Sequence, residues 1–169
     1  MDNLFGFKKV FLMLTDVGRL VALSATDGKV QWAEYFGGNV EKVIVRNILD
    51  SEIREKGENT QTQQVAVILQ DEIRFLDPKT GLKHKEFDLA TGVKREFIII
   101  SMSNSGAQFI LAVVDEALEN EKPLIAYPPD VFTESLMVGE NIFFTHVDNT
   151  KNTLTGYKLR KDLVAVKVW

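Results

Sequence analysis

The chain has 169 residues, of which 45% are hydrophobic and 26% charged, and its formal net charge is −4. That length allows a sizeable core, either as one domain or as a large part of a bigger one. The mild acidity argues against nucleic-acid binding, which needs clustered Lys and Arg, because the one dense basic run, residues 158–161, is followed at once by Asp162. The absence of Cys excludes disulfides and thiolate metal sites.

Neither end of the chain carries a targeting or anchoring signal. Residues 1–9 lack the charged start and the long apolar stretch of a signal peptide. The longest apolar run, residues 97–100, falls far short of the roughly 18 residues that a membrane span requires. We therefore expect no membrane span in this segment.

Short β-rich runs separated by turn residues follow one another along the whole chain, without a long amphipathic helix. Gly18 and the pair Asp27-Gly28 each lie between apolar runs, which is typical of hairpins because Gly accepts the positive φ of a tight turn. The pattern predicts an all-β chain. The expected strands are 10–14, 20–23, 30–32, 43–48, 65–69, 73–76, 83–89, 97–101, 109–114, 124–127, 142–147, 153–159 and 164–169.

Three segments break this rhythm. Residues 51–62 are polar and residues 115–122 are acidic, and we expect both to be solvated loop insertions. Residues 131–138 fit either a short helix or a strand, and the sequence does not decide between them.

An internal repeat is the most informative feature. Leu23 and Leu76 are 53 residues apart, and so are Gly28 and Gly81; each unit is a strand ending in Leu, a four-residue polar turn and a Gly. Weaker copies start near residues 125 and 157, and they suggest approximate repeat units 1–42, 43–92, 93–139 and 140–169 within a single propeller segment. Four strands per period of roughly 40–50 residues predict the blades of a β-propeller, here an incomplete one of about three to four blades.

Structural roles follow for the repeat residues. We expect Gly18, Asp27, Gly28, Pro78 and Gly81 to shape turns. The two tryptophans, Trp32 and Trp169, close the first and last copies in similar places, and we expect them to lock one blade against the next.

A catalytic constellation is not recognisable. The two histidines, His84 and His146, fall inside expected strands, and Gly37-Gly38 lacks the third Gly and the following helix of a phosphate loop. The acidic run 115–121 lacks the ligand spacing and the Gly turn of a calcium loop. We therefore expect a non-enzymatic protein without cofactor or metal, whose loop-bearing faces bind partners.

The turn pattern, a strand before "x-x-Thr-Gly" and a Trp after it, resembles the quinoprotein (PQQ-like) propeller repeat. At the two ends the likeness is more specific. The start, Phe5-Gly6-Phe7-Lys8-Lys9 through Gly18 to Trp32, and the end, Ile142-Phe143-Phe144 through Gly156-Tyr157-Lys158-Leu159-Arg160-Lys161-Asp162, resemble subunit 1 of the ER membrane protein complex.

That resemblance implies a lumenal scaffold built from PQQ-like propeller repeats in a complex that inserts transmembrane proteins into the endoplasmic reticulum membrane. It implies localisation in the ER lumen and no enzymatic residues. The partners that it implies are the other subunits of the complex and client membrane proteins. It also implies that the chain is an internal fragment of a longer protein. Open strand edges of an incomplete propeller would then favour dimerisation.

Two alternatives stay open: a PQQ-like propeller of another assembly factor, and a fragment of a quinoprotein dehydrogenase, which would need a quinone site and Ca²⁺ ligands. A candidate partner surface is the edge near Phe143, Tyr157 and Arg160. The competing interpretation of its aromatic residues is blade-to-blade packing.

Overall fold

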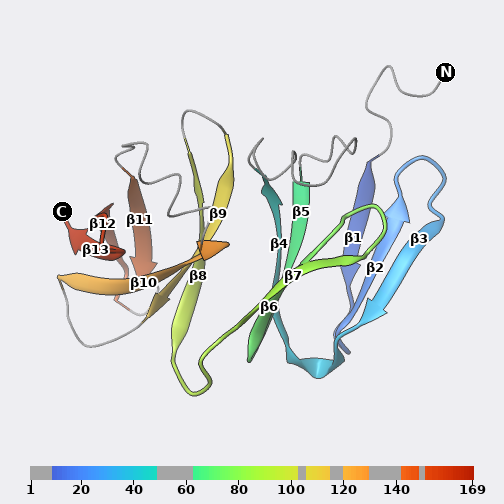
Figure 1. Ribbon diagram of the computed structural model, residues 1–169, viewed down its shortest axis with the longest axis horizontal. Helices are drawn as coiled ribbons and strands as arrows, with labels where there is room; N and C mark the ends of the chain where they lie inside the picture. Colours follow the sequence, from blue (N-terminus) through green and yellow to red (C-terminus); the bar gives the residue numbers. More distant parts are fainter. Residues whose placement is uncertain (1–8, 49–62, 103–105, 115–119, 130–141, 149–150) are drawn as a thin grey trace. The chain divides into compact units, whose positions relative to one another are not determined.

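Antiparallel β-hairpins build every part of the chain that the structure describes. The computed structural model describes residues 9–48, 63–102, 106–114, 120–129, 142–148 and 151–169. The strands are rich in Val, Ile, Leu and Phe, the residues that pack best on a pleated surface, and Gly residues with positive φ connect several of them. The strands form three sheets, which fall into two compact units (Figure 1).

The first unit holds two sheets. The first sheet has the order β1-β2-β3 and the second sheet the order β4-β5-β6-β7. A short 3₁₀ helix, η1 (Gly37–Asn39), connects them. The strands are β1 (Val10–Leu14), β2 (Arg19–Ser24), β3 (Val30–Tyr35), β4 (Val40–Asn47), β5 (Gln63–Leu69), β6 (Glu72–Leu76) and β7 (Lys83–Asp88).

Side chains from both sheets share one hydrophobic cluster in this unit. Leu20 of the first sheet is buried together with Val65, Val67 and Leu76 of the second, and Trp32 packs against them. The two sheets therefore pack face to face, as adjacent blades of a propeller do. The central strand β5 is buried on both faces from Gln64 to Leu69, which explains its nearly continuous apolar sequence.

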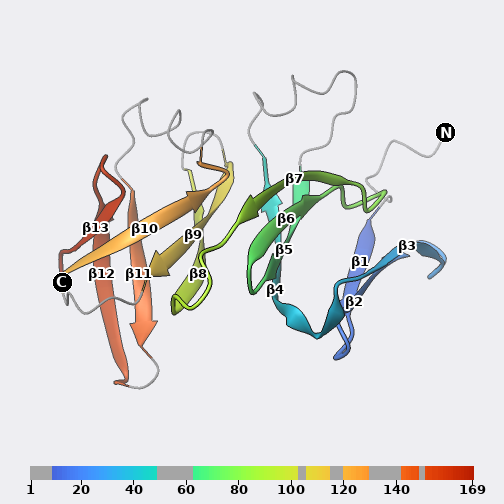
Figure 2. The ribbon, with the colours of Figure 1, turned by 60° about the horizontal axis from the view of Figure 1, so that its bottom comes forward.

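The second unit is a single six-stranded sheet with the order β11-β12-β13-β10-β9-β8, called the third sheet below (Figure 2). Strand β10 pairs with β13 and with β9 through different parts of its length. Its first three residues pair with β13, and residues Leu124–Tyr127 pair with β9. The strands are β8 (Arg95–Ser101), β9 (Gln108–Val114), β10 (Glu121–Tyr127), β11 (Phe143–Asp148), β12 (Thr153–Leu159) and β13 (Val164–Lys167).

The switch of partner along β10 divides the third sheet into two halves that share one core. Phe109, Leu111 and Leu124 come from one half, and Tyr157 and Leu159 come from the other; all five are buried in one cluster. His146 of β11 contacts the Glu96 carboxylate of β8, so the two edge strands of this sheet approach each other. The sheet is therefore strongly curved.

The all-β prediction is confirmed, and each of the 13 runs expected from the sequence overlaps one strand. One boundary was wrong: Glu121 and Lys122 were assigned to an acidic loop, but they begin β10 and pair with Val166 and Ala165 of β13. Residues 51–62, 115–119 and 131–138 lie outside the described residues. The four repeat units stay a prediction, and β4 begins at Val40, inside the expected first unit.

Candidate functional site

The repeated turns have the same hydrogen bonds in both copies. In the first copy the N–H of Ser24 donates to the carbonyl of Lys29 at 2.8 Å, and the N–H of Gly28 donates to Ser24 at 2.8 Å. In the second copy Asp77 and Gly81 make the equivalent bonds at 2.9 and 2.8 Å. Gly28 and Gly81 have φ values of +70° and +71°, a conformation that side chains rarely adopt.

The strands on either side of these turns also match. Phe11 lies opposite Leu23, just as Val65 lies opposite Leu76. The strand pairs that follow, β2–β3 and β6–β7, each have a bulge immediately before Leu23 or Leu76. Two sheets can have strands of the same length and spacing without a bulge at the same position, so the shared bulge is additional evidence that the two copies match. The first and second sheets are therefore copies of one structural unit.

The carboxylates differ between the copies. The Asp77 carboxylate is buried at the start of its turn and accepts the N–H groups of Lys79 and Thr80 at 2.7 and 3.0 Å. Asp27 instead stands just before Gly28, exposed, and accepts the N–H of Lys29 at 3.2 Å. Hydrogen bonds from Ser24 and then Lys29 lower the pKa of Asp27. Both side chains stabilise the turn as acceptors of backbone N–H groups.

Trp32 joins the first sheet to the second. Its indole N–H donates a hydrogen bond to the carbonyl of Pro78 at 2.8 Å. Its ring lies so close to Gly81 that an added Cβ would stand 2.7 Å from the ring carbon Cδ2. The ring of Trp32 thus packs on Gly81 and is hydrogen-bonded to Pro78, a contact called the indole seat below. Only Gly at position 81 leaves room for the aromatic ring.

Gly18 is required by a close approach of a different kind. It has φ +80°, and an added Cβ would overlap the carbonyl oxygen of Gly37 in η1. Its own carbonyl accepts the N–H of Phe36 at 2.9 Å. Gly18 therefore holds the β1–β2 turn against the connection that leads into the second sheet.

Trp169 lies on its own sheet. Its ring covers Gly156 in the middle of β12, where any Cβ would clash with the indole, and its side chain is 60% exposed. It also occupies a different register from Trp32. Trp32 lies opposite Ala22, the residue before the turn leucine Leu23. In the last copy Lys158 is the residue that corresponds to Ala22, and it lies opposite Val166, not opposite Trp169. The two tryptophans are therefore not equivalent in the repeat.

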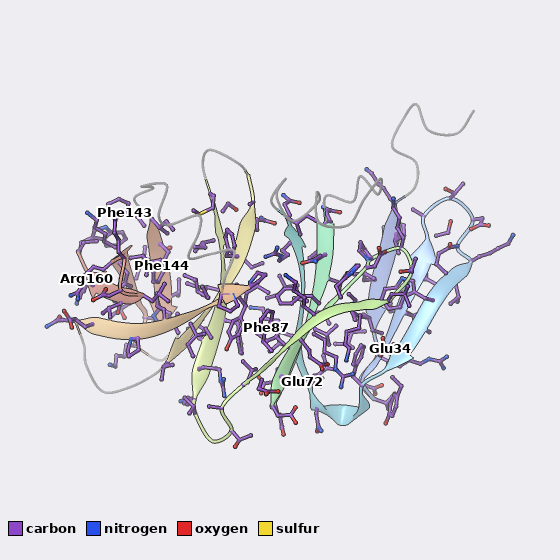
Figure 3. All side chains as sticks on the ribbon, in the orientation of Figure 1. Glu34, Glu72, Phe87, Phe143, Phe144 and Arg160 are labelled. Atoms are coloured by element: carbon purple, nitrogen blue, oxygen red, sulfur yellow. The ribbon has the colours of Figure 1, made fainter. Side chains whose placement is uncertain are left out.

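The three residues of the expected partner surface have different surroundings; Phe143 and Arg160 are labelled in Figure 3. Phe143 is 61% exposed, whereas Tyr157 is only 4% exposed and stacks on Phe144 at 5.6 Å between ring centroids. Burial raises the pKa of Tyr157. Arg160 lies in the β12–β13 turn, where it pairs with Asp162 and Glu121. Tyr157 therefore belongs to the core, and the partner surface at this edge stays a prediction.

Sequence reasoning missed Gly156, Phe11 and Met13. A Gly inside a strand often marks a close approach by another group, and this signal at Gly156 would have located the Trp169 contact. Phe11 and Met13 are large apolar residues on β1 that are 65% and 49% exposed. They lie in a continuous apolar run, residues 10–14, which does not indicate which face of the strand is exposed, so no local signal distinguishes them.

Both histidines lie beside a carboxylate. The Nε2 of His84 lies 3.7 Å from the Asp77 carboxylate, and His146 contacts Glu96. Across the described residues, groups of three or more potential metal ligands do not occur. Among these same residues, helices long and apolar enough to cross a membrane are also absent.

Repeated antiparallel sheets with matching turns and bulges, packed face to face through an indole seat, define a β-propeller protein. The sequence matches the family model described as ER membrane protein complex subunit 1, second beta-propeller, over residues 6–169. The chain belongs to this family and is therefore part of a multi-subunit complex associated with the endoplasmic reticulum. Among curated proteins no match was found.

Proposed function

We propose that the chain is a non-catalytic scaffold of the ER membrane protein complex, located in the ER lumen, that supports the insertion and folding of transmembrane proteins. The observation that carries the proposal is the family match over residues 6–169. Its partners are then the other subunits of the complex and, during insertion, the client membrane proteins.

The packing of the sheets supports a scaffold role. Sheets locked face to face by a buried cluster and by the Trp32–Gly81 contact present loops and edges at fixed positions. Such rigid arrays bind several partners without paying for conformational ordering. The described side chains that pair, such as Asp77 with His84, stabilise turns and strands, which is a structural use of polar groups.

Insertion of a tail-anchored client into ER membranes tests the function. We expect membranes that carry the Trp32→Ala variant to lose insertion in proportion to the loss of assembled complex, because a scaffold acts through assembly. The exposed-turn variant Lys79→Ala is the matched control and should leave both quantities unchanged. Loss of insertion at full complex assembly would contradict a scaffold role.

Lumenal location has a separate test. The sequence contains no Asn-x-Ser/Thr acceptor site, so Leu154→Thr creates a single one at Asn152, which is exposed in the β11–β12 turn. In the lumen this variant gains an endoglycosidase-sensitive glycan, whereas the double variant with Asn152→Gln does not. An unmodified Leu154→Thr chain in membrane-associated complex would refute lumenal placement.

A further inference from the structure

Strands β3 and β7 are the corresponding last strands of the two repeated sheets. Among the described strands each pairs on one side only, β3 with β2 and β7 with β6 (Figure 1). The interval of 53 residues found for the turns also applies here, so Val30–Tyr35 corresponds to Lys83–Asp88. The open edges of the two strands can therefore be compared position by position.

The hydrogen bonds between β2 and β3 show which backbone groups of β3 point to its open edge. The N–H of Phe36 donates to the carbonyl of Gly18 at 2.9 Å, so these two residues form a hydrogen-bonded pair. Hydrogen-bonded and non-hydrogen-bonded pairs alternate along an antiparallel ladder. The backbone groups of Ala33 and Tyr35 therefore point away from β2, toward the open edge.

The same geometry holds in the second copy. The N–H of Leu89 donates to the carbonyl of Asp71 at 2.6 Å, so the backbone groups of Glu86 and Asp88 point to the open edge of β7. Glu86 and Asp88 stand exactly one repeat interval after Ala33 and Tyr35. At the two positions that expose backbone donors and acceptors, β7 thus carries two acids and β3 carries none.

The rest of the two strands shows the same contrast. Four of the six residues of β7 are charged, and charged side chains, Lys above all, protect an edge strand from pairing. In β3 the only charged residue is Glu34, and the strand contains neither Pro nor Gly. Its exposed residues include Val30 and Tyr35, which favour β-structure. A neutral segment of this kind pairs readily with another strand.

The surroundings of β3 indicate the chemistry of that strand. The chain leaves β3 through η1 and enters β4, which pairs with β5, so the next strand of the chain is not available to this edge. Nearby carboxylates have partners, since Glu72 pairs with Arg74 and Glu86 pairs with Lys83. Among the described side chains Glu34 has no ion-pair partner, so a basic residue fits opposite it.

We propose that the open edge of β3 pairs with an extended strand of another subunit of the ER membrane protein complex. That strand is apolar and carries a Lys or Arg opposite Glu34. The inference rests on the proposed function, because it assumes that the chain assembles with the other subunits, and it identifies where one of them attaches. Strand addition uses backbone groups at an edge and is separate from side-chain packing on the faces of the sheet.

Hydrogen exchange of single amides measures this pairing. The intact tagged complex is compared with the full-length subunit after its separation from the others. We expect the amides of Ala33 and Tyr35 to exchange roughly 100-fold more slowly in the complex, and those of Glu86 and Asp88 to exchange equally in both samples. Equal rates for Ala33 and Tyr35 would overturn the proposal. Fast exchange in both samples would mean an open edge, and slow exchange in both would mean a strand of the same polypeptide or of a second copy.

Ala33→Pro identifies the partner. It removes an N–H that points away from β2, so the ladder between β2 and β3 keeps its hydrogen bonds, and Pro is tolerated at such edge positions. We expect the amount of one copurifying subunit to fall about tenfold. Ala33→Glu introduces the residue that β7 carries at this position and should release the same subunit. Glu86→Pro is the matched control and should release none, because the N–H of Glu86 also points to an open edge.

The outcomes separate this inference from the scaffold role. If the wild-type protein brings down the other subunits and Ala33→Pro retains all of them, strand addition at β3 is wrong and the scaffold role stands. If the wild-type protein brings down none of them, both are wrong. Glu34→Lys should release the same subunit as Ala33→Pro, because it places like charges opposite each other. Retention of that subunit by Glu34→Lys would contradict a basic residue in the partner strand.

Discussion

The contact between Trp32 and Gly81 can be dissected by substitution, because its steric and conformational parts separate. Gly81→Ala introduces two costs: a side chain at φ +71°, and a Cβ 2.7 Å from the indole ring. Gly28→Ala introduces only the first, since its φ is +70° and its surroundings are open. A left-handed conformation costs an L-residue about 1–2 kcal/mol. We expect Gly28→Ala to destabilise the purified chain by about 1 kcal/mol.

Gly81→Ala should cost about 1 kcal/mol more than Gly28→Ala, because the indole must move and its bond to Pro78 weakens. Trp32→Ala should cost about 3 kcal/mol, near the lower end for a large aromatic side chain, because the ring is only partly buried. With Trp32 already removed, Gly81→Ala should cost only the conformational part. The double variant is therefore less destabilised than the sum of the single variants, by about 1 kcal/mol.

Urea unfolding followed by far-ultraviolet circular dichroism measures all four variants. With a slope of about 1–3 kcal/mol per molar urea, a change of 1 kcal/mol moves the midpoint by roughly 0.3–1 M. Equal costs for Gly81→Ala and Gly28→Ala, or strict additivity with Trp32→Ala, would refute the indole seat as a contact that holds the two sheets together.

Three further substitutions have definite expected results. Gly18→Ala should destabilise the chain by more than about 2 kcal/mol in urea unfolding, because its Cβ overlaps the rigid Gly37 carbonyl as well as adopting φ +80°. Gly156→Ala should expel the Trp169 ring, so the Trp169 fluorescence, read in a Trp32→Phe background, should shift to longer wavelength; an unchanged spectrum would mean that the ring does not lie on Gly156. Arg160→Gln should raise the lowered pKa of Asp162 toward its ordinary value in an NMR carboxyl titration, since the hydrogen bond and charge of Arg160 hold it down. A carboxylate whose pKa is lower in the folded state than in the unfolded state stabilises the folded protein above its unfolded pKa, and this stabilisation is lost as the pH falls through the folded pKa. In Arg160→Gln the free energy of unfolding should therefore decrease less as the pH is lowered.

The strands and turns were predictable because they depend on local sequence. Alternating apolar residues and Gly at turns determine where strands start and end, and the interval of 53 residues between Gly28 and Gly81 revealed the repeat. Trp32 was expected to join blades, and the structure places it on Gly81 and Pro78. The carbonyl of Pro78 as hydrogen-bond partner depends on tertiary packing, so the sequence does not reveal it.

Features that depend on register or on pairing between distant strands escaped prediction. Trp169 looked equivalent to Trp32 because both follow a repeat turn, but the pairing of β12 with β13 places Val166 in that position. The start of β10 looked like a loop because Glu121 and Lys122 are polar, yet backbone pairing with β13 does not require apolar side chains. The burial of Tyr157 could not be decided from the sequence, because the strand alternation around it does not indicate which face is buried.

The measurement that tests the central claim most directly is purification of the tagged protein from detergent-solubilised ER membranes, with mass identification and quantification of the proteins that copurify. The account predicts recovery of the other subunits of the ER membrane protein complex in fixed ratio, and a reduced yield of all of them with Trp32→Ala. Recovery of the protein without those subunits, or its absence from ER membranes, would contradict the scaffold role and leave only the propeller fold.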